Sequence, residues 1–198
     1  ALVAAEVAFP AIMLPKVKSP GEVNAVDEML DEYGLATRLH VIIETNAGLE
    51  AAYEIARASD RIEALFFGGV DMAADLRCHN DWESLLYARS RVVHAAAGAD
   101  LDVVDVPYLD LDDLDGMRLE AERAAALGFS GKGSIHPKQI PILNDVFSPD
   151  ADAIAYAEKV VAAFAEADSG LVVVDGKLIE KPVLRTAHRI LAAAGKGA

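Results

Sequence analysis

The apolar residues of this chain form short, unbroken runs that alternate with longer segments in which apolar positions recur at helical spacing. Residues 11–14 are the first run, and Ser19 and Pro20 then supply the signals that start a helix. One face of this helix carries four apolar side chains, those of Val23, Val26, Met29 and Leu30. An uninterrupted apolar run is typical of a strand in a parallel sheet that is covered on both faces. The pattern therefore predicts a strand, a loop and a helix.

The same unit repeats along the chain. Further strands are predicted at residues 39–43, 64–67, 103–106 and 131–135. The helices between them are predicted at residues 48–58, 85–98 and 115–127. A helix at 150–167 then precedes a hairpin of two short strands, 171–174 and 177–179, and a last helix follows at 183–194. The hairpin is indicated by Asp175-Gly176, a favoured two-residue turn.

Strands that alternate with helices indicate parallel β/α units, so we expect an α/β fold. Five strands are too few for an eight-stranded barrel, and the first strand is not followed by the glycine-rich turn of a dinucleotide-binding sheet. An open doubly wound sheet and part of a barrel both fit this pattern. The chain starts without methionine at Ala1, inside what is predicted to be a helix tail at residues 1–8, so we expect a preceding segment.

Composition narrows the class of partner and of site. The formal net charge of −14 argues against nucleic acid or an anionic membrane surface, since both would be repelled. Cys78 is the single cysteine, which excludes a disulfide framework within the chain and a site built on several thiolates. No apolar run approaches the roughly 18 residues of a membrane helix. These features predict a protein of the cytoplasm.

Two carboxylates follow predicted strands at corresponding places. Glu44 directly follows the strand 39–43, and Asp71 follows the strand 64–67 after Gly68, Gly69 and Val70. Because adjacent parallel strands end at the same edge of a sheet, the two side chains could share one divalent cation. Magnesium needs only one or two carboxylates besides water and substrate oxygens. The glycines would let a substrate carboxylate approach backbone amides, which suits a 2-oxo acid bound to the metal.

Other interpretations of these polar residues stay open on the sequence alone. Glu44 and Asp71 could equally cap the helices that follow them. Lys16 follows a predicted strand and could offset the charge of a phosphate or carboxylate, or be an ordinary loop lysine. His136 precedes Pro137 at the start of a helix, a place where a structural role is more common than a catalytic one.

Seven motifs of the chain occur in the order seen in a known family. They are Leu14-Pro15-Lys16-Val17, Ile43-Glu44-Thr45 with Gly48, the segment 68–76, Leu86-Tyr87-Ala88-Arg89-Ser90, Leu127-Gly128-Phe129 with Gly131-Lys132, Ile135-His136-Pro137 with Gln139, and Asn144 with Phe147-Ser148-Pro149. With them the chain resembles the citrate lyase β-subunit-like proteins of the HpcH/HpaI aldolase family, which includes malyl-CoA and citramalyl-CoA lyases. The resemblance covers nearly the whole chain.

The resemblance implies a TIM (β/α)8 barrel, of which this chain would carry about strands four to eight. It implies that Glu44 and Asp71 bind Mg²⁺, with Gly68, Gly69, Val70 and Lys16 as substrate-binding candidates. We expect residues 1–168 to be the C-terminal part of the barrel. Residues 169–198 would be a hairpin-helix extension that reaches the site of a neighbouring subunit in a trimer or hexamer.

The implied reaction is a reversible Claisen-type cleavage of a carbon–carbon bond in the CoA thioester of a 3-hydroxy dicarboxylic acid. Glu180 stands where the CoA lyases of the family carry a catalytic aspartate, and it is the candidate acid or base. The arginine that grips the substrate carboxylate in the family has no counterpart in this chain. Two alternatives are hydrolysis of a malyl-CoA-type thioester on the same scaffold, and metal-dependent binding of an oxo acid or acyl-CoA without turnover.

Overall fold

A computed structural model describes residues 9–167 and 170–195, which form two compact units, one up to Leu143 and one from Asn144. The helix tail expected at residues 1–8 lies outside the described residues. Among the described residues, no helix is long and apolar enough to cross a membrane. The two units are treated separately below.

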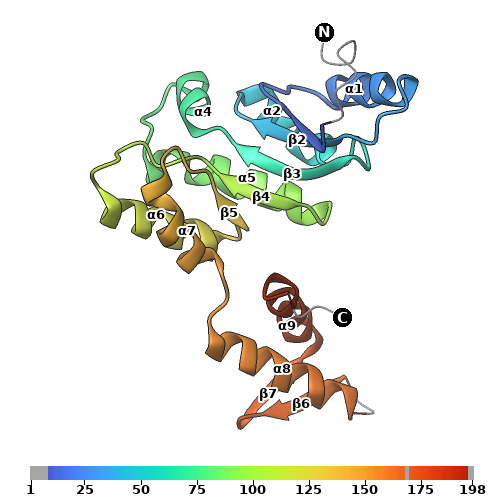
Figure 1. Cartoon of the computed structure of the whole chain (residues 1–198), viewed down its shortest axis with the longest axis vertical. Coiled ribbons are helices and arrows are strands. Elements are labelled where there is room, and N and C mark those ends of the chain that lie inside the picture. Colours follow the sequence, from blue (N-terminus) through green and yellow to red (C-terminus); the bar gives the residue numbers. More distant parts are fainter. Residues whose placement is uncertain (1–8, 168–169, 196–198) are drawn as a thin grey trace. The chain divides into compact units, whose positions relative to one another are not determined.

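The first unit is built around a five-stranded parallel sheet (Figure 1). Its strands are β1 (Ala11–Leu14), β2 (Arg38–Ile43), β3 (Ile62–Phe67), β4 (Asp102–Asp105) and β5 (Gly131–Lys132). They lie side by side in chain order, each parallel to the next. A doubly wound sheet reverses its strand order at one point, and this sheet does not. The arrangement confirms the α/β fold class as a partial barrel.

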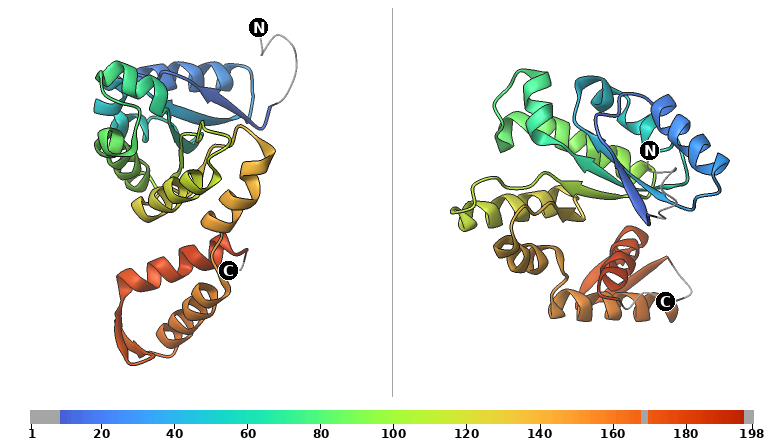
Figure 2. Two further views of the ribbon diagram at one scale, coloured as in Figure 1. Left: turned by 90° about the vertical axis from the view of Figure 1, so that its left-hand side faces the viewer. Right: turned by 45° about the horizontal axis from the view of Figure 1, so that its top comes forward.

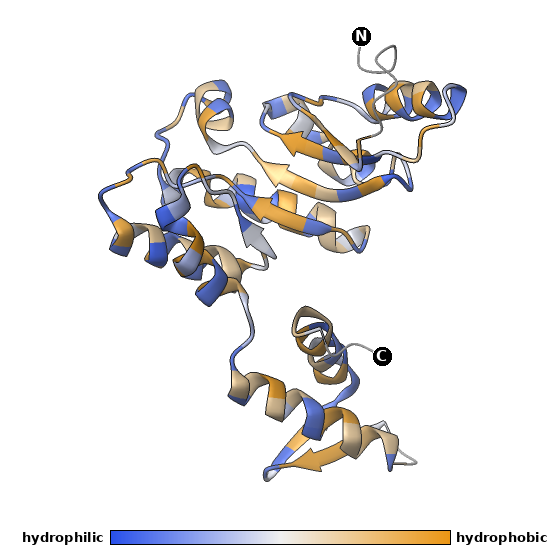
Figure 3. Ribbon diagram, in the orientation of Figure 1, coloured by the Kyte–Doolittle hydropathy of each residue, from blue (hydrophilic) through white to orange (hydrophobic). Residues whose placement is uncertain are grey.

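Helices connect consecutive strands of this sheet. They are α1 (Pro20–Glu32), α2 (Asn46–Glu50), α3 (Ala52–Ile55), α4 (Gly69–Leu76), α5 (Trp82–Gly98) and α6 (Leu114–Leu127), with the 3-10 helix η2 (Pro137–Gln139) and α7 (Ile140–Phe147) after the last strand. Figure 2 shows these connections from two further directions. The main core lies between the sheet and the long helix α5, where Val41, Leu65 and Val92 are fully buried. Figure 3 shows most of β2, β3 and β4 in orange, the colour of hydrophobic residues.

Several elements differ from the sequence prediction. The helix expected at 48–58 begins earlier, at Asn46, and is interrupted at Ala51, so it forms α2 and α3. Residues 69–76 form the helix α4, which was not among the helix ranges predicted from the sequence. The fifth strand has only two residues, because its continuation turns toward η2.

An ion-pair network is buried beneath the carboxyl ends of β3, β4 and β5. Arg89 on α5 donates from Nε to Asp105 Oδ1 at 2.9 Å, and Lys132 on β5 donates from Nζ to Asp105 Oδ2 at 2.7 Å. Glu120 on α6 accepts a second bond from Lys132 Nζ at 2.6 Å. Two cations thus face two carboxylates. Asp105 is the centre of the network, since each of its oxygens accepts from a different buried cation.

The second unit consists of α8 (Ala151–Ala165), the antiparallel hairpin β6 (Leu171–Val174) and β7 (Lys177–Glu180), and α9 (Lys181–Ala193). Both turn residues have positive φ angles, 48° at Asp175 and 77° at Gly176, which is the geometry the Asp-Gly pair predicted. Its core joins both helices to one hairpin face, through Ala157, Val160, Val174, Ile179, Ala187 and Leu191. Helix α8 belongs to this core, and the compact unit begins at Asn144.

We predict that Asp105→Ala lowers the free energy of unfolding by about 3–5 kcal/mol, because two buried cations lose their shared partner. Chemical denaturation of the purified protein measures this loss. Asp102→Ala is the matched control, since Asp102 is an exposed aspartate at the other end of β4. Its effect should stay within about 0.5 kcal/mol. Equal losses in the two variants would contradict the structural role of the network.

Candidate metal centre

Glu44 and Asp71 lie together at the carboxyl edge of the sheet. Strands β2 and β3 are paired in parallel with Ile43 beside Phe67, so both chains leave the sheet at the same level. Glu44 is the residue after Ile43, and Asp71 lies in the first turn of α4, shortly after Phe67. Both carboxyl groups contact the same residue, Lys16. The structure therefore brings together the two acids that the sequence singled out.

Neither carboxylate caps the helix that follows it, so the capping alternative is wrong for this pair. The residue that caps α2 is Thr45, whose Oγ1 accepts the Gly48 N–H at 3.0 Å. At α4 the cap position belongs to Gly68, which has no side chain to offer. Asp71 is still favourably placed, because the positive end of the helix dipole lies in the first turn.

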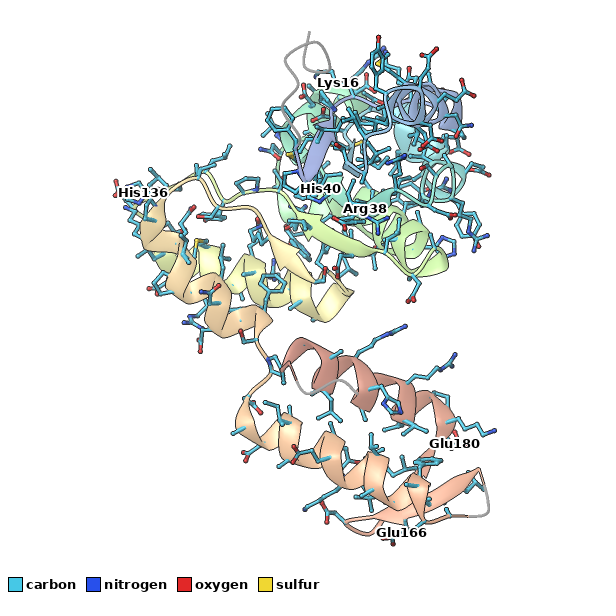
Figure 4. All side chains as sticks on the ribbon, turned by 45° about the vertical axis from the view of Figure 1, so that its right-hand side comes forward. Lys16, Arg38, His40, His136, Glu166 and Glu180 are labelled. Atoms are coloured by element: carbon cyan, nitrogen blue, oxygen red, sulfur yellow. The ribbon has the colours of Figure 1, made fainter. Side chains whose placement is uncertain are left out.

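Lys16 supplies the positive charge at this pair of acids. Its ammonium Nζ lies 2.8 Å from Asp71 Oδ2, and its backbone N–H donates to Glu44 Oε1 at 2.9 Å. The residue has a positive φ of 55°, a conformation that residues other than glycine, asparagine and aspartate rarely adopt. Figure 4 shows Lys16 at the end of the sheet that holds the candidate centre. One residue thus satisfies one carboxylate with its backbone and the other with its side chain.

The two carboxyl groups titrate differently because their surroundings differ. Glu44 is 8% exposed, and burial raises its pKa above the usual 4.5, with a further contribution from the neighbouring negative charge of Asp71. The hydrogen bond from Lys16 lowers the pKa of the exposed Asp71 carboxyl below 3.8. The same contact raises the pKa of the Lys16 ammonium. Asp71 is therefore readily ionised, whereas a bound cation would be needed to favour ionisation of Glu44.

Gly68 and Gly69 fill different roles in this arrangement. A Cβ atom on Gly68 would overlap the side chain of Glu44, so this glycine makes room for the carboxylate. Its N–H donates to Ile43 O at 3.1 Å and is already used by the sheet. A Cβ on Gly69 would lie 3.0 Å from Val106 Cγ1. Amides for a ligand would thus come from Gly69 and Val70 at the start of α4, and not from Gly68.

Other polar residues near strand ends have structural partners. Asp75 accepts a hydrogen bond from the Asn46 N–H and ties α4 to the first residue of α2. His136 caps η2, because its Nδ1 accepts the Lys138 N–H at 3.1 Å. Gln139 is fully buried and accepts the Ile135 N–H with Oε1 at 3.0 Å. Sequence reasoning missed this role of Gln139, although its place in the Ile135-His136-Pro137 motif was a signal.

Glu180 belongs to the second unit and is exposed at the junction of β7 and α9 (Figure 4). It pairs with Leu171 across the hairpin. The outer face of this hairpin also presents the exposed side chains of Leu171, Val173 and Leu178. The candidate acid therefore lies at the border of an exposed apolar surface.

The donor set at Glu44 and Asp71 fits a magnesium ion. The described part of the chain contains no cluster of three or more acids, histidines or cysteines that could form an all-protein metal cage. Magnesium does not require one, because it binds through one or two carboxylates and keeps positions for water and substrate oxygens.

Comparison with known proteins adds an independent observation. The profile of the HpcH/HpaI aldolase/citrate lyase family matches residues 2–137. Citrate lyase subunit beta of Leuconostoc mesenteroides subsp. cremoris is 33% identical over 192 residues, 91% of this chain and 64% of that protein. (3S)-malyl-CoA thioesterase of Cereibacter sphaeroides is 37% identical over 188 residues, with 92% and 64% covered. The chain thus spans less than two thirds of the length of these relatives.

A solved structure is also similar to the chain. The protein CitE from Mycobacterium tuberculosis, in complex with magnesium, acetoacetate and coenzyme A, matches with a TM-score of 0.76 and 29% identity. The match covers 96% of this chain and 70% of that one.

The raised pKa of Glu44 leads to a prediction about stability and pH. Glu44 is protonated in both states well below pH 4.5, and as the pH rises through its folded-state pKa, ionisation increasingly favours the unfolded chain. Glu44→Gln removes this contribution. The unfolding free energy of the variant, relative to the wild type, should therefore increase from pH 4.5 toward neutrality. Denaturation without divalent cations measures it, and a constant or decreasing difference would contradict the assignment.

Proposed function

The chain belongs to the HpcH/HpaI aldolase/citrate lyase family, and on this basis we propose that the protein is a magnesium-dependent carbon–carbon lyase. Its substrate would be the CoA thioester of a 3-hydroxy dicarboxylic acid such as citramalyl-, malyl- or citryl-CoA. The observation that carries the proposal is the convergence of Glu44 and Asp71 at the ends of two adjacent parallel strands. The family supplies the reaction class, and the two carboxylates supply a place for the metal.

Glu44 and Asp71 would hold the magnesium ion, and the ion would supply Lewis-acid polarisation of a substrate oxygen. The Lys16 ammonium forms an ion pair with Asp71 at 2.8 Å, and a cation bound to the Asp71 carboxylate would compete with this ammonium. The Lys16 side chain is about half exposed, so it can swing away without unpacking the core. Once released, it would offset negative charge on the substrate.

The start of α4 would bind the carboxylate of the oxo acid. Gly69 and Val70 belong to the first turn of this helix, where backbone N–H groups lack partners within the helix and the dipole favours an anion. Gly68 serves the same site indirectly, because only a residue without Cβ leaves room for the Glu44 carboxylate.

The cleavage needs a base at the 3-hydroxyl group and an acid at C2. A base takes the hydroxyl proton, the C2–C3 bond breaks, and C3 becomes the carbonyl of the oxo acid. The bonding electron pair moves to C2 as a thioester enolate, which then takes up a proton to give the acyl-CoA. Glu180 is the candidate acid or base for this proton traffic, acting in the site of a neighbouring subunit.

The exposed apolar face of the hairpin supports an assembly of identical subunits. Leu171, Val173 and Leu178 are each close to half exposed or more, and they border Glu180. Contact of this face with another subunit would bury apolar area and place the glutamate at the interface. A trimer or hexamer is the assembly we propose.

We predict that Glu44→Ala and Asp71→Ala each abolish magnesium binding in the absence of substrate, because without substrate oxygens the remaining carboxylate would be the single non-water ligand of the ion. Calorimetric titration of Mg²⁺ into the purified protein measures the affinity. Asp75→Asn is the control on the same helix, and it should bind the ion as the wild type does because its partner is the Asn46 N–H. Unchanged metal affinity in both alanine variants would refute the site.

Thioester hydrolysis is the second candidate function, and the similarity to a (3S)-malyl-CoA thioesterase favours considering it. Product analysis with malyl-CoA separates the two reactions, because cleavage gives glyoxylate and acetyl-CoA whereas hydrolysis gives free malate and CoA. We predict glyoxylate and acetyl-CoA. Tight binding of magnesium and an oxo acid, with no turnover of any CoA ester, would instead favour a binding protein.

Glu180→Ala should lower the rate of cleavage by roughly 10²–10⁴-fold, the usual contribution of a positioned acid or base. A subunit-mixing experiment tests its action across an interface. Glu180→Ala and Asp71→Ala subunits, each strongly impaired alone, should regain activity when mixed, because some sites then combine an intact metal centre with an intact glutamate. Absence of rescue in verified mixed oligomers would place Glu180 outside the neighbouring site.

A further inference from the structure

Gly69 is closely enclosed where α4 begins, beside the candidate metal centre. A Cβ atom on this residue would lie 3.0 Å from Val106 Cγ1 and 3.3 Å from Phe67 Cε1, nearer than side chains normally pack. The φ angle of Gly69 is not positive, so its backbone conformation would accept alanine. At such a position alanine normally stabilises a protein relative to glycine. The glycine therefore answers to the two side chains that face it.

Val106 belongs to a segment that is held on both sides. The residue before it is Asp105, whose carboxylate oxygens both belong to the buried ion-pair network. The Asp105 carbonyl oxygen also accepts the Gly133 N–H at 2.9 Å. On the other side, the Tyr108 carbonyl oxygen accepts from Gln139 Nε2 at 2.9 Å. Val106 thus has little freedom to give way to a larger residue at position 69.

Phe67 is held by the same network. It is the last residue of β3 and is 2% exposed. The Arg89 guanidinium lies 5.0 Å from the centroid of its ring, and Arg89 donates from Nε to Asp105. Both side chains that face Gly69 are therefore fixed from beneath. A methyl group added at Gly69 would displace the turn of the helix more easily than it would displace either side chain.

The first turn of α4 carries the groups that would bind the ligands. Asp71 lies two residues after Gly69, and its Oδ2 contacts Lys16 Nζ at 2.8 Å. The backbone amides of Gly69 and Val70 belong to the same turn. A displacement of this turn by a few tenths of an ångström would move a metal ligand and both amides together.

We propose that Val106 is a positioning residue of the candidate metal centre, because its contact with Gly69 sets where the first turn of α4 lies. Phe67 shares this task, and the network around Asp105 holds both side chains in place. Val106 acts through Gly69 and supplies no polar group of its own. The inference rests on the proposed function only for the identity of the ligands that this turn binds.

A steric-rescue experiment tests this role by calorimetric titration of pyruvate in the presence of Mg²⁺. Gly69→Ala should weaken pyruvate binding roughly tenfold, because the added methyl group forces the turn away from its place. A double variant with Gly69→Ala and Val106→Ala should bind within about threefold of Val106→Ala alone, because the shortened side chain leaves room for the methyl group.

The matched control combines Gly69→Ala with Val104→Ala. It removes the same atoms two positions earlier in the chain, from a valine whose Cγ2 would lie 3.8 Å from a Cβ on Gly131. This control should bind pyruvate as weakly as Gly69→Ala does. Circular dichroism shows which variants fold. If Gly69→Ala does not fold, Val106→Ile extends the same contact from the other side and should also weaken binding.

A measurement without ligands separates this inference from the proposed function. The backbone amide signal of Asp71 in a ¹H–¹⁵N NMR spectrum reports the position of the turn. It should move in Gly69→Ala and return toward its Val106→Ala position in the double variant. This pattern in a protein that binds neither Mg²⁺ nor pyruvate would refute the proposed function and leave the positioning role standing. An unmoved signal in folded Gly69→Ala, or equal recovery with Val104→Ala, would overturn the inference.

Discussion

The parallel pairing of β2 with β3 places two carboxylates side by side, and the first unit has to accommodate that juxtaposition. The negative charges of Glu44 and Asp71 repel each other, and burial makes ionisation of the Glu44 carboxyl group less favourable still. The backbone N–H and the ammonium of Lys16 offset this repulsion, and Lys16 lies just after the neighbouring strand β1. Gly68 leaves the space that the Glu44 side chain occupies. Three consecutive strands therefore cooperate in holding one pair of acids.

The ion-pair network around Asp105 lies beneath the same edge of the sheet and differs from the site at Glu44. Around Asp105 the charges are balanced, buried and fully engaged except for Arg89 Nη1. Around Glu44 they are less buried, since the side chains of Lys16 and Asp71 are each about half exposed. A buried ion-pair network beneath a more exposed one suits a site that must position a ligand closely while charges are exchanged.

The sequence predicted the sheet well because each strand is an unbroken apolar run, a local feature that survives folding. It also predicted that Glu44 and Asp71 converge, since parallel strands in chain order bring their carboxyl ends to one edge. The sequence did not predict the buried network formed by Arg89, Asp105 and Lys132. Asp105 lies 16 positions from Arg89 and 27 from Lys132, and no local pattern links them. The bounds of helix α4 were not predicted, because the conformation of Gly68 and Gly69 at its start depends on contacts with Glu44 and Val106, which are distant in the sequence.

Lys16 gives this edge of the sheet a cation that is permanently attached to the chain. A tethered ammonium is present at a high effective concentration beside Asp71, whatever the composition of the surrounding solution. An incoming divalent ion would therefore exchange with a resident charge and would not enter a vacant, strongly negative site. Such exchange lowers the affinity for the ion, yet the Lys16 ammonium can pair with Asp71 again as soon as the ion leaves. Turnover of the bound cation could then keep pace with the arrival and departure of an anionic ligand.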